Sequence, residues 1–437
     1  MQFQNVFSFF KDNKLNFSAI FVSLSLVVYP ATVLLVPKVN GLIIGLFALS
    51  GLYLLFRYRD KSTQVNQDEK LFYLSLGIFF LVSLFITLYG GFAYKAIGKY
   101  LHLLLAIPIY IYFRHVGIKL LYLWYGLVAG AIVVAGIAIY DVWITDTPRY
   151  WGNGDLRAMG ITHPIIFGDL ALVMGVMSIA GLGWFKQRSA WQALLPVIAL
   201  LCGVLASVLS IARGGWVAVP FLVLVFFWYI KSRFSFKFKI IIAAAVIVLI
   251  GVIYAVPQTK VKHHVDRTIT SLQQYGDSEI KSIHRRTSVG TRLEMWQASW
   301  KIFLDNPVMG VGWGHYKEQA QAQVDQGLRN KSAATFDHPH SEYFSALAHG
   351  GILGFSVLML LFLTPAWIFI KYIKYGKSVE SRRLALAGLV LVVAYMAFGI
   401  SEPMLYRSRS VGFFALYLAI FMAGIYQEED KAISRKS

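Results

Sequence analysis

The stretch Asp337–Gly354, DHPHSEYFSALAHGGILG, sets two histidines, a proline and a Ser-Glu pair directly ahead of a long apolar run. That run continues to about residue 370, so it is long enough to cross a hydrocarbon core of roughly 30 Å as a helix. A spanning helix that begins in this way brings polar groups to the surface of a membrane. His338 and His340 are therefore the first candidates for a functional site.

The composition is that of a membrane protein. Hydrophobic residues make up 57% of the 437 residues, and the mean hydropathy is +0.60, whereas soluble globular domains are about 45–50% apolar. The apolar segments are long continuous runs, unlike the short alternating segments of outer-membrane strands. The sequence therefore predicts an all-α polytopic membrane protein.

Charge and cysteine content exclude several other classes. The net charge is +19, but Lys and Arg occur in short clusters between apolar runs, so we expect no nucleic-acid partner. Cys202 is the single cysteine, which excludes a disulfide framework and a thiolate metal cluster. The first apolar run begins near Phe17 and lacks a small-residue cleavage site, so we expect it to remain as the first span.

The apolar runs predict about twelve membrane spans. They cover roughly residues 16–36, 40–57, 71–89, 96–113, 119–140, 163–184, 191–211, 214–230, 239–256, 343–370, 384–400 and 410–426. Lys and Arg concentrate in alternate short connections, for example from Arg57 to Lys70 and from Lys371 to Arg383. By the positive-inside rule these connections, and both termini with them, lie in the cytoplasm.

One connection is far longer than the rest and is expected on the external side. The chain divides into residues 1–256 with nine spans, a large partly helical loop over 257–342, and residues 343–437 with three spans and a cytoplasmic tail. A loop of this length is expected to fold or to carry function. In TRLEMWQASWKIFLDNP, Trp296 and Trp300 belong to an apolar stripe at helical spacing that Asn306-Pro307 ends. The glycines of the following GVGWGHY predict a tight turn.

Four polar residues are expected to gather at the external face: Arg157, Arg213, Arg292 and His340. Arginine near a hydrocarbon core is costly, which implies a partner. Guanidinium groups bind phosphate oxygens in a bidentate way and stabilise a leaving diphosphate. A histidine, with an ordinary pKa of about 6.5, takes up a proton near neutral pH. The set suits a site for a phosphorylated lipid, with transfer to an attacking hydroxyl. Asp169, inside the sixth span, has no partner that the sequence identifies.

Each of these residues also has a plain structural interpretation. The arginines could be solvated or could extend to the membrane surface, and either histidine could bond the backbone. Glu342 and Glu294 suit ion pairs with nearby arginines, and Trp296 suits packing. His338 and His340 could in principle ligate zinc, but the chain has no D-x-D, H-E-x-x-H or Walker motif. We therefore expect no metal and no cofactor.

Three motifs resemble those of the O-antigen ligase and polymerase superfamily. From His340 to Gly354 the chain has H-S, nine residues and G-x-x-G, similar to the H-[NSQ]-x9-G-x-x-[GTY] pattern of that superfamily. IARGGW resembles its Ser-Arg-Gly element, with Ala212 in place of the serine. TRLEMWQASWKIFLDNPVMGVGWGHY resembles its R-x-x-x-W and N-P-x-x-G-x-G segment. The resemblance covers roughly residues 150–420.

This resemblance implies a GT-C-type glycosyltransferase of the bacterial inner membrane, with its active site on the periplasmic side. The single large loop, between spans nine and ten, is typical of the ligases, which move O-antigen from undecaprenyl diphosphate to the lipid A-core without a metal and with inversion. By motif, Arg213 and Arg292 would engage the diphosphate and His340 would be the base or acceptor orienter. Arg157 is placed there by context, and His338, Glu342 and Trp296 would support the site.

Three other functions stay open at this point. Two of them belong to the same superfamily: an O-antigen polymerase and a protein O-oligosaccharyltransferase, which differ in the acceptor. A transporter of lipid-linked sugars is an alternative of another class. Transporters commonly show repeated halves and charges at the membrane midplane, whereas the arginines here are expected at one face. Oligomeric state does not follow from the sequence.

Overall fold

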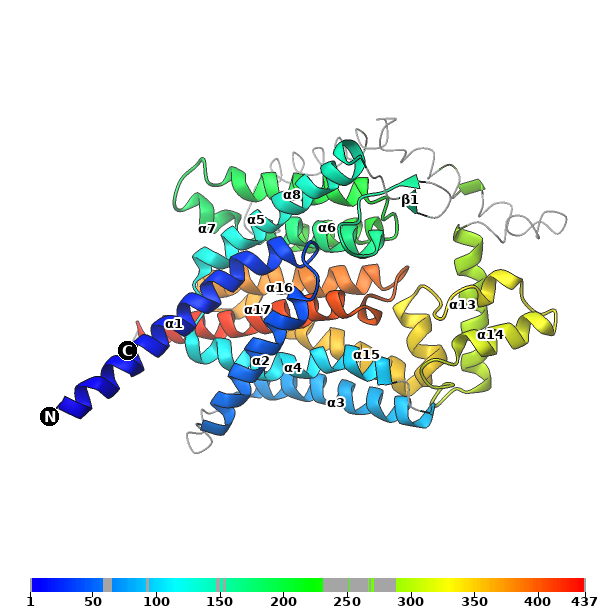
Figure 1. The fold of residues 1–437 in the computed structure, drawn as a ribbon, viewed down its shortest axis with the longest axis horizontal. Coiled ribbons are helices and arrows are strands. Elements are labelled where there is room, and N and C mark those ends of the chain that lie inside the picture. Colours follow the sequence, from blue (N-terminus) through cyan, green and yellow to red (C-terminus); the bar gives the residue numbers. More distant parts are fainter. Residues whose placement is uncertain are drawn as a thin grey trace.

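The protein is a bundle of long helices with a smaller helical part at one end (Figure 1). The computed structural model describes residues 2–57, 65–91, 94–146, 150–151, 155–230, 251, 266, 269–270 and 288–435. Its α-helices are α1 (Gln2–Thr32), α2 (Val39–Arg57), α3 (Gln67–Tyr89), α4 (Tyr94–Val116), α5 (Leu120–Ile139), α6 (Pro164–Ala180), α7 (Leu182–Lys186), α8 (Leu194–Leu209), α9 (Ala218–Ile230), α13 (Ser288–Asp305), α14 (Tyr316–Asp325), α15 (Glu342–Tyr375), α16 (Val379–Phe398) and α17 (Ser408–Ser434).

Short elements occupy several connections. A π-helical turn (Tyr140–Ile144) continues α5, and 3-10 turns cover Gly215–Val217, Lys331–Ala334 and Met404–Tyr406. The two-residue strands β1 (Tyr150–Trp151) and β2 (Asp155–Leu156) pair antiparallel. Helix therefore dominates the described residues, as the apolar runs predict.

Each predicted span overlaps a helix, except the ninth, 239–256, which lies outside the described residues apart from Gly251. Among the described residues, six helical segments are long and apolar enough to cross a membrane: α2, α3, α5 with its π-helical turn, α15, α16 and α17. Phe17–Thr32, α6, α8 and Gly215–Ile230 are shorter apolar helices. These findings support a multi-pass membrane protein, while the number of twelve spans and the GT-C type stay predictions.

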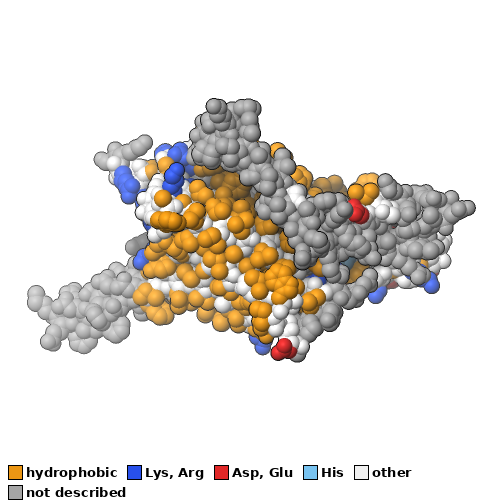
Figure 2. Space-filling view, turned by 90° about the horizontal axis from the view of Figure 1, so that it is seen from above, with side chains coloured by type: hydrophobic (Ala, Val, Ile, Leu, Met, Phe, Trp, Pro, Cys, Tyr) orange, Lys and Arg blue, Asp and Glu red, His pale blue; other side chains and the backbone are white. Residues whose placement is uncertain are grey.

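Two of these helices form the centre of the bundle. In α17 and α16, 94% and 83% of the most apolar window is buried, against 33–44% in α2, α3, α5 and α15. Neighbouring helices therefore cover α16 and α17 on most sides. The outer helices instead expose apolar side chains over a broad surface (Figure 2), which suits contact with lipid.

The described segment before α15, residues 288–341, folds against one end of the bundle. The helix predicted over TRLEMWQASWKIFLDNP is α13, which with α14 encloses a small core that includes Met295, Ile302 and Tyr316. Gly310 and Gly312 have φ values of 61° and 80°, so the predicted tight turn is confirmed. A Cβ at Gly310 would lie 2.4 Å from the backbone of His349, which explains why glycine is needed at this approach.

Glycine also permits the closest approach of α1 to α5, and this predicts a stability effect. A Cβ at Gly126 would lie 2.0 Å from the carbonyl oxygen of Leu26, whereas one at Gly136 meets nothing within 4 Å. We expect Gly126→Leu to destabilise the bundle by about 1–3 kcal/mol or more through overpacking. Gly136→Leu, on the same helix, should be neutral or slightly stabilising. Melting temperatures of the purified variants measure the difference, and equal values would contradict the close approach.

Candidate functional site

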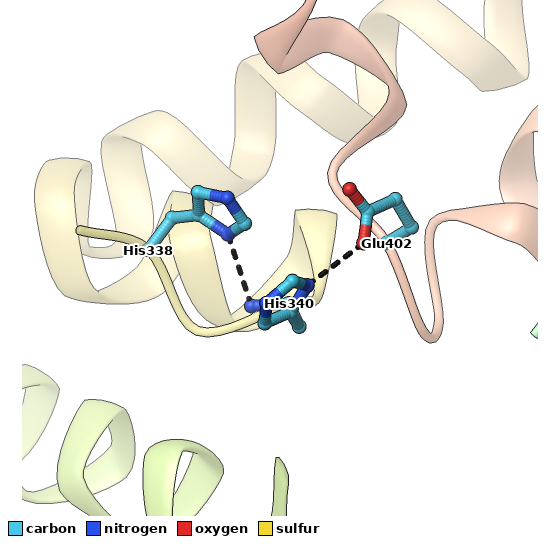
Figure 3. Close-up of side chains that lie close together, drawn as sticks. All are labelled: His338, His340 and Glu402. Atoms are coloured by element: carbon cyan, nitrogen blue, oxygen red, sulfur yellow. Dashed lines mark hydrogen bonds and ion pairs between the residues drawn. The ribbon is translucent and has the colours of Figure 1, made fainter. Parts of the chain in front are cut away.

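His340 lies at the start of α15, at the end of the bundle where α13 packs, and its side chain faces Glu402 (Figure 3). The distance from Nδ1 of His340 to Oε2 of Glu402 is 2.8 Å. His340 has φ 48°, in the left-handed region that residues other than glycine rarely adopt. Such a conformation persists only where the surroundings enforce it, and it is common at functional sites.

The surroundings that enforce it come from two directions. The Glu342 N–H donates to the carbonyl of Gly399 (2.7 Å), and the Glu342 carboxylate accepts from the Leu405 N–H (2.8 Å). These bonds join the start of α15 to the connection between α16 and α17. From the other side, Nε1 of Trp296 donates to the carbonyl of Pro339 (3.1 Å). The backbone around His340 is therefore held between the bundle and α13.

Glu402 is the acidic partner, and it is 1% exposed. Burial alone would raise the pKa of Glu402, but the hydrogen bond from His340 and the positive charges of the nearby histidines outweigh it and lower the pKa. An ionised carboxylate only accepts hydrogen bonds. The pairing therefore assigns the proton of a neutral His340 to Nδ1 and leaves Nε2 as the acceptor.

Positive groups surround this pair. Nε of Arg407 lies 4.0 Å from Oε1 of Glu402. Burial lowers the pKa of Arg292, and the charge of Glu402 partly opposes that effect, so these two groups lie within electrostatic reach of each other. His163, at the start of α6, experiences the charges of Arg407, Glu402, His340 and Arg157. Two of the three predicted arginines, Arg157 and Arg292, thus belong to the cluster around His340 and Glu402.

Arg213 reaches the same region through its loop. It follows Ile211, which has φ 55°, and it precedes two glycines that pack closely. A Cβ at Gly214 would lie 2.2 Å from Oγ of Ser401, the residue before Glu402. The structure therefore sets the Arg213 loop against the connection that carries Glu402.

The predicted supporting residues have structural contacts. His338 is 4% exposed, and its Nδ1 accepts from the His340 N–H (3.3 Å). Trp296 also stacks on Phe344, with ring centroids 5.4 Å apart. The expected ion pair of Glu342 with an arginine is not found among the described residues, and its carboxylate instead accepts from the Leu405 N–H. For Glu294, the carboxylate accepts from the Asn330 N–H (3.0 Å).

Asp169 is fully buried in α6, at 0% exposed. Neither carboxylate oxygen has a hydrogen-bond partner among the described residues. A Cβ at Gly215 would lie 1.9 Å from Oδ1, so Asp169 packs directly beneath the Arg213 loop. The charge of Glu402 acts on Asp169, so the two carboxyl groups lie within electrostatic reach of each other.

Sequence reasoning missed Glu402, Arg407 and His163. The signal for Glu402 was present: SEPMLYR is a short connection between two apolar runs, and Glu402 is the one acidic residue in it. A lone carboxylate on the predicted external side, where a histidine and arginines are also expected, was a candidate partner for them.

A metal ion has one candidate set of ligands among the described residues: His338, His340 and Glu402, whose ligand atoms lie within 4.8 Å of one another. However, Nδ1 of His340 and Oε2 of Glu402 already bond each other, and Nδ1 of His338 bonds the His340 N–H. Arg407 and Arg292 add positive charge. The donor set can therefore approach a metal, but the electrostatics favour an anion.

The burial of His338 predicts a loss of stability in acid. Burial, followed by the charge of His340, lowers the pKa of His338 to about 4. The unfolded chain binds this proton at an ordinary pKa of about 6.5, so stability falls as the pH falls from about 6.5 to about 4. We expect a loss on the order of 1–2 kcal/mol at pH 5.

The melting temperature at pH 7 and pH 5 measures this loss. The drop should be smaller in His338→Gln, which has no group to protonate, than in the wild type. His115→Gln removes an exposed histidine and serves as the control. An identical drop in wild type and His338→Gln would contradict the assignment.

Comparison with known proteins agrees with the motifs. Residues 198–359 match the model of the O-antigen ligase family. This segment includes Arg213, Arg292, His338 and His340, while Arg157 and Glu402 lie outside it. An uncharacterized protein of Haemophilus influenzae is 25% identical over 396 residues, which are 90% of this chain and 95% of that protein. The family match confirms the resemblance that the sequence motifs predict: residues 198–359 are similar to the O-antigen ligase family.

Proposed function

We propose that the protein is an O-antigen ligase, which transfers O-antigen polysaccharide from undecaprenyl diphosphate to a hydroxyl of the lipid A-core. The observation that carries this proposal is the His340–Glu402 pair, 2.8 Å apart, within a cluster of arginines. The pair supplies a base for a hydroxyl, and the arginines supply charge for a diphosphate. Similarity to the O-antigen ligase family makes lipid-linked polysaccharide the expected class of donor.

In the proposed reaction the acceptor hydroxyl lies against Nε2 of His340. Its oxygen attacks the anomeric carbon of the donor sugar while the bond from that carbon to the diphosphate oxygen breaks. The hydroxyl proton passes to Nε2, and the diphosphate leaves with the bonding electron pair. Glu402 keeps the ring oriented and stabilises the imidazolium that forms, as a carboxylate does behind a catalytic histidine in other enzymes.

The arginines act on the leaving group. Arg157, Arg213 and Arg292 are proposed to bind the diphosphate oxygens, which gain charge as the bond breaks. Fixed positive groups aimed at developing charge are usually the largest single contribution to catalysis. Arg407 contacts Glu402 at 4.0 Å, so we assign it to holding the carboxylate and not to the substrate.

The proposal includes a topology. The protein would lie in the bacterial inner membrane, with both termini cytoplasmic and His340 on the periplasmic side, where lipid-linked O-antigen and lipid A-core meet. Residues 257–342 would form the large periplasmic loop between nine spans and the last three. Exposed apolar side chains on the outer helices suit the surrounding membrane lipids.

An acceptor-choice assay with purified protein tests the function. The protein is given undecaprenyl-diphosphate-linked glycan in a buffer with EDTA, and lipid A-core, free repeat unit and acceptor protein are offered separately. We expect modified lipid A-core and full activity in EDTA. Chain extension alone would indicate a polymerase, and labelled protein would indicate an oligosaccharyltransferase. Activity that disappears in EDTA and returns with a divalent ion would overturn the metal-free mechanism.

Variants of the pair test its roles in the same assay. His340→Ala should lower turnover by roughly 10²–10⁴-fold because the base is lost. Glu402→Gln should lower kcat and change the pH profile of kcat, since an amide does not stabilise the imidazolium. Glu318→Gln makes the same change beside another histidine, His315 (3.4 Å), in an exposed position, and should be silent. Unchanged turnover in His340→Ala would remove the histidine from the mechanism.

Arginine-to-lysine changes test the diphosphate contacts. Lysine keeps the charge but loses the bidentate geometry of guanidinium. Arg213→Lys and Arg292→Lys should each lower kcat/KM by about tenfold or more. Arg329→Lys, in the same loop region as Arg292, is the control and should have wild-type kinetics. Wild-type turnover in Arg213→Lys and Arg292→Lys would mean that both residues anchor the structure and do not hold phosphate.

A further inference from the structure

A cavity of about 450 Å³ lies at the end of the bundle away from Glu402. Helix α17 begins at Ser408, close to Glu402 in the chain, and Lys431 near its other end lines the cavity. At 1.5 Å per residue the two ends of this helix segment are ~35 Å apart, comparable to the thickness of a hydrocarbon core. In Figure 1, α7 and the C-terminus lie at the left of the bundle and α13 lies at the right. The cavity and the His340 site therefore lie at opposite ends of the bundle.

The polar lining of this cavity is mainly basic. Lys119, Arg188 and Lys431 contribute positive charge, and Glu428 is the acidic lining residue. Lys431 pairs with Glu428 at 2.7 Å. Lys119 and Arg188 therefore leave a net positive charge in the cavity.

Arg188 is held in place by Trp184. Its guanidinium carbon lies 3.2 Å from the centroid of the Trp184 ring, and Nη1 donates to the Trp184 carbonyl (3.2 Å). Trp184 is 4% exposed, so the ring is a fixed platform. An arginine stacked in this way keeps further N–H groups for an anion.

The position of Lys119 is fixed by the turn before α5, which is hydrogen-bonded to a side chain of α17. Gly117 has φ 90°, and the next residue, Ile118, donates its N–H to Oε1 of Gln427 (2.9 Å). Lys119 follows at the start of α5. Its ammonium group has no hydrogen bond or ion pair with the part of the chain that the structure describes. An exposed ammonium beside a stacked guanidinium is suited to a phosphate group.

The cavity also opens beside apolar surface. Its lining residue Leu121 is 41% exposed, and Ile20, next to the lining residue Ala19, is 63% exposed. Figure 2 shows the apolar surface of the bundle, with Lys and Arg side chains gathered at its left end. A ligand that matches both features has a negative headgroup and acyl chains.

We propose that this cavity binds the headgroup of an anionic phospholipid, with the phosphate between Lys119 and Arg188 and the acyl chains along the exposed side chains near Leu121. Basic pockets at the ends of membrane helices bind such headgroups through the same combination of charge and apolar surface. The site is independent of glycan transfer at His340. On the predicted topology it would face the cytoplasmic leaflet.

Lipid binding to the full-length protein in detergent tests the proposal by native mass spectrometry, with phosphatidylglycerol as the probe. Phosphatidylcholine supplies a phosphate without net charge, and inorganic phosphate supplies charge without acyl chains. We expect phosphatidylglycerol to bind the wild type. The double variant Lys119→Gln/Arg188→Gln should bind it with an affinity lower by roughly tenfold or more. Lys186→Gln, an exposed residue of α7 outside the cavity, should bind as the wild type does.

A second variant keeps the test decisive if the double variant is unstable. Glu428→Gln releases Lys431 and should strengthen phosphatidylglycerol binding several-fold. Equal binding to wild type, the double variant and Glu428→Gln would overturn the site. Equal binding of phosphatidylcholine, or competition by inorganic phosphate at the affinity of the lipid, would overturn its assignment to an anionic lipid. Glycan transfer is not the readout, so failure here leaves the ligase proposal standing.

Discussion

The carboxylate of Glu402 is ionised and almost completely buried, and this buried charge determines which groups must surround it. An isolated buried charge costs several kcal/mol, so it persists only where hydrogen bonds and opposite charges compensate it. His340 supplies the hydrogen bond at 2.8 Å, Arg407 lies 4.0 Å away, and Arg292 acts through its field. Because positive groups outnumber the carboxylate, the cluster as a whole suits an anionic ligand.

The position of Glu402 is set by the most buried part of the bundle. Its connection joins α16 to α17, whose apolar windows are 83% and 94% buried. The start of α15 bonds this connection through Gly399 and Leu405. His340 is thereby held against a rigid scaffold at one end of the bundle. Helices provide this kind of precision better than a free loop does.

The two ends of α17 have different chemistry. Near its start lie the buried carboxylate of Glu402, His340 and partly exposed arginines, where we propose proton transfer and diphosphate binding. Near its other end, Lys119 and Arg188 line an open cavity beside apolar surface. The first arrangement is suited to reaction and the second to recognition of a lipid surface. One rigid helix fixes the separation between them at about the thickness of a membrane core.

The sequence by itself determined the class, the helices and the candidates. Continuous apolar runs predict helices because a segment in lipid must bond its own backbone, and the runs overlap the helices wherever the structure describes them. Motif spacing identified His340 and Arg292, since both depend on local order along the chain. Only the tertiary structure decided that Glu402, 62 residues after His340, is the partner of that histidine, and that the Glu342 carboxylate accepts from a backbone amide, that of Leu405. Packing of α15 against the end of α16 brings these groups together. The periodicity of the sequence reports local secondary structure, so it does not predict which polar residues far apart in the chain will be in contact.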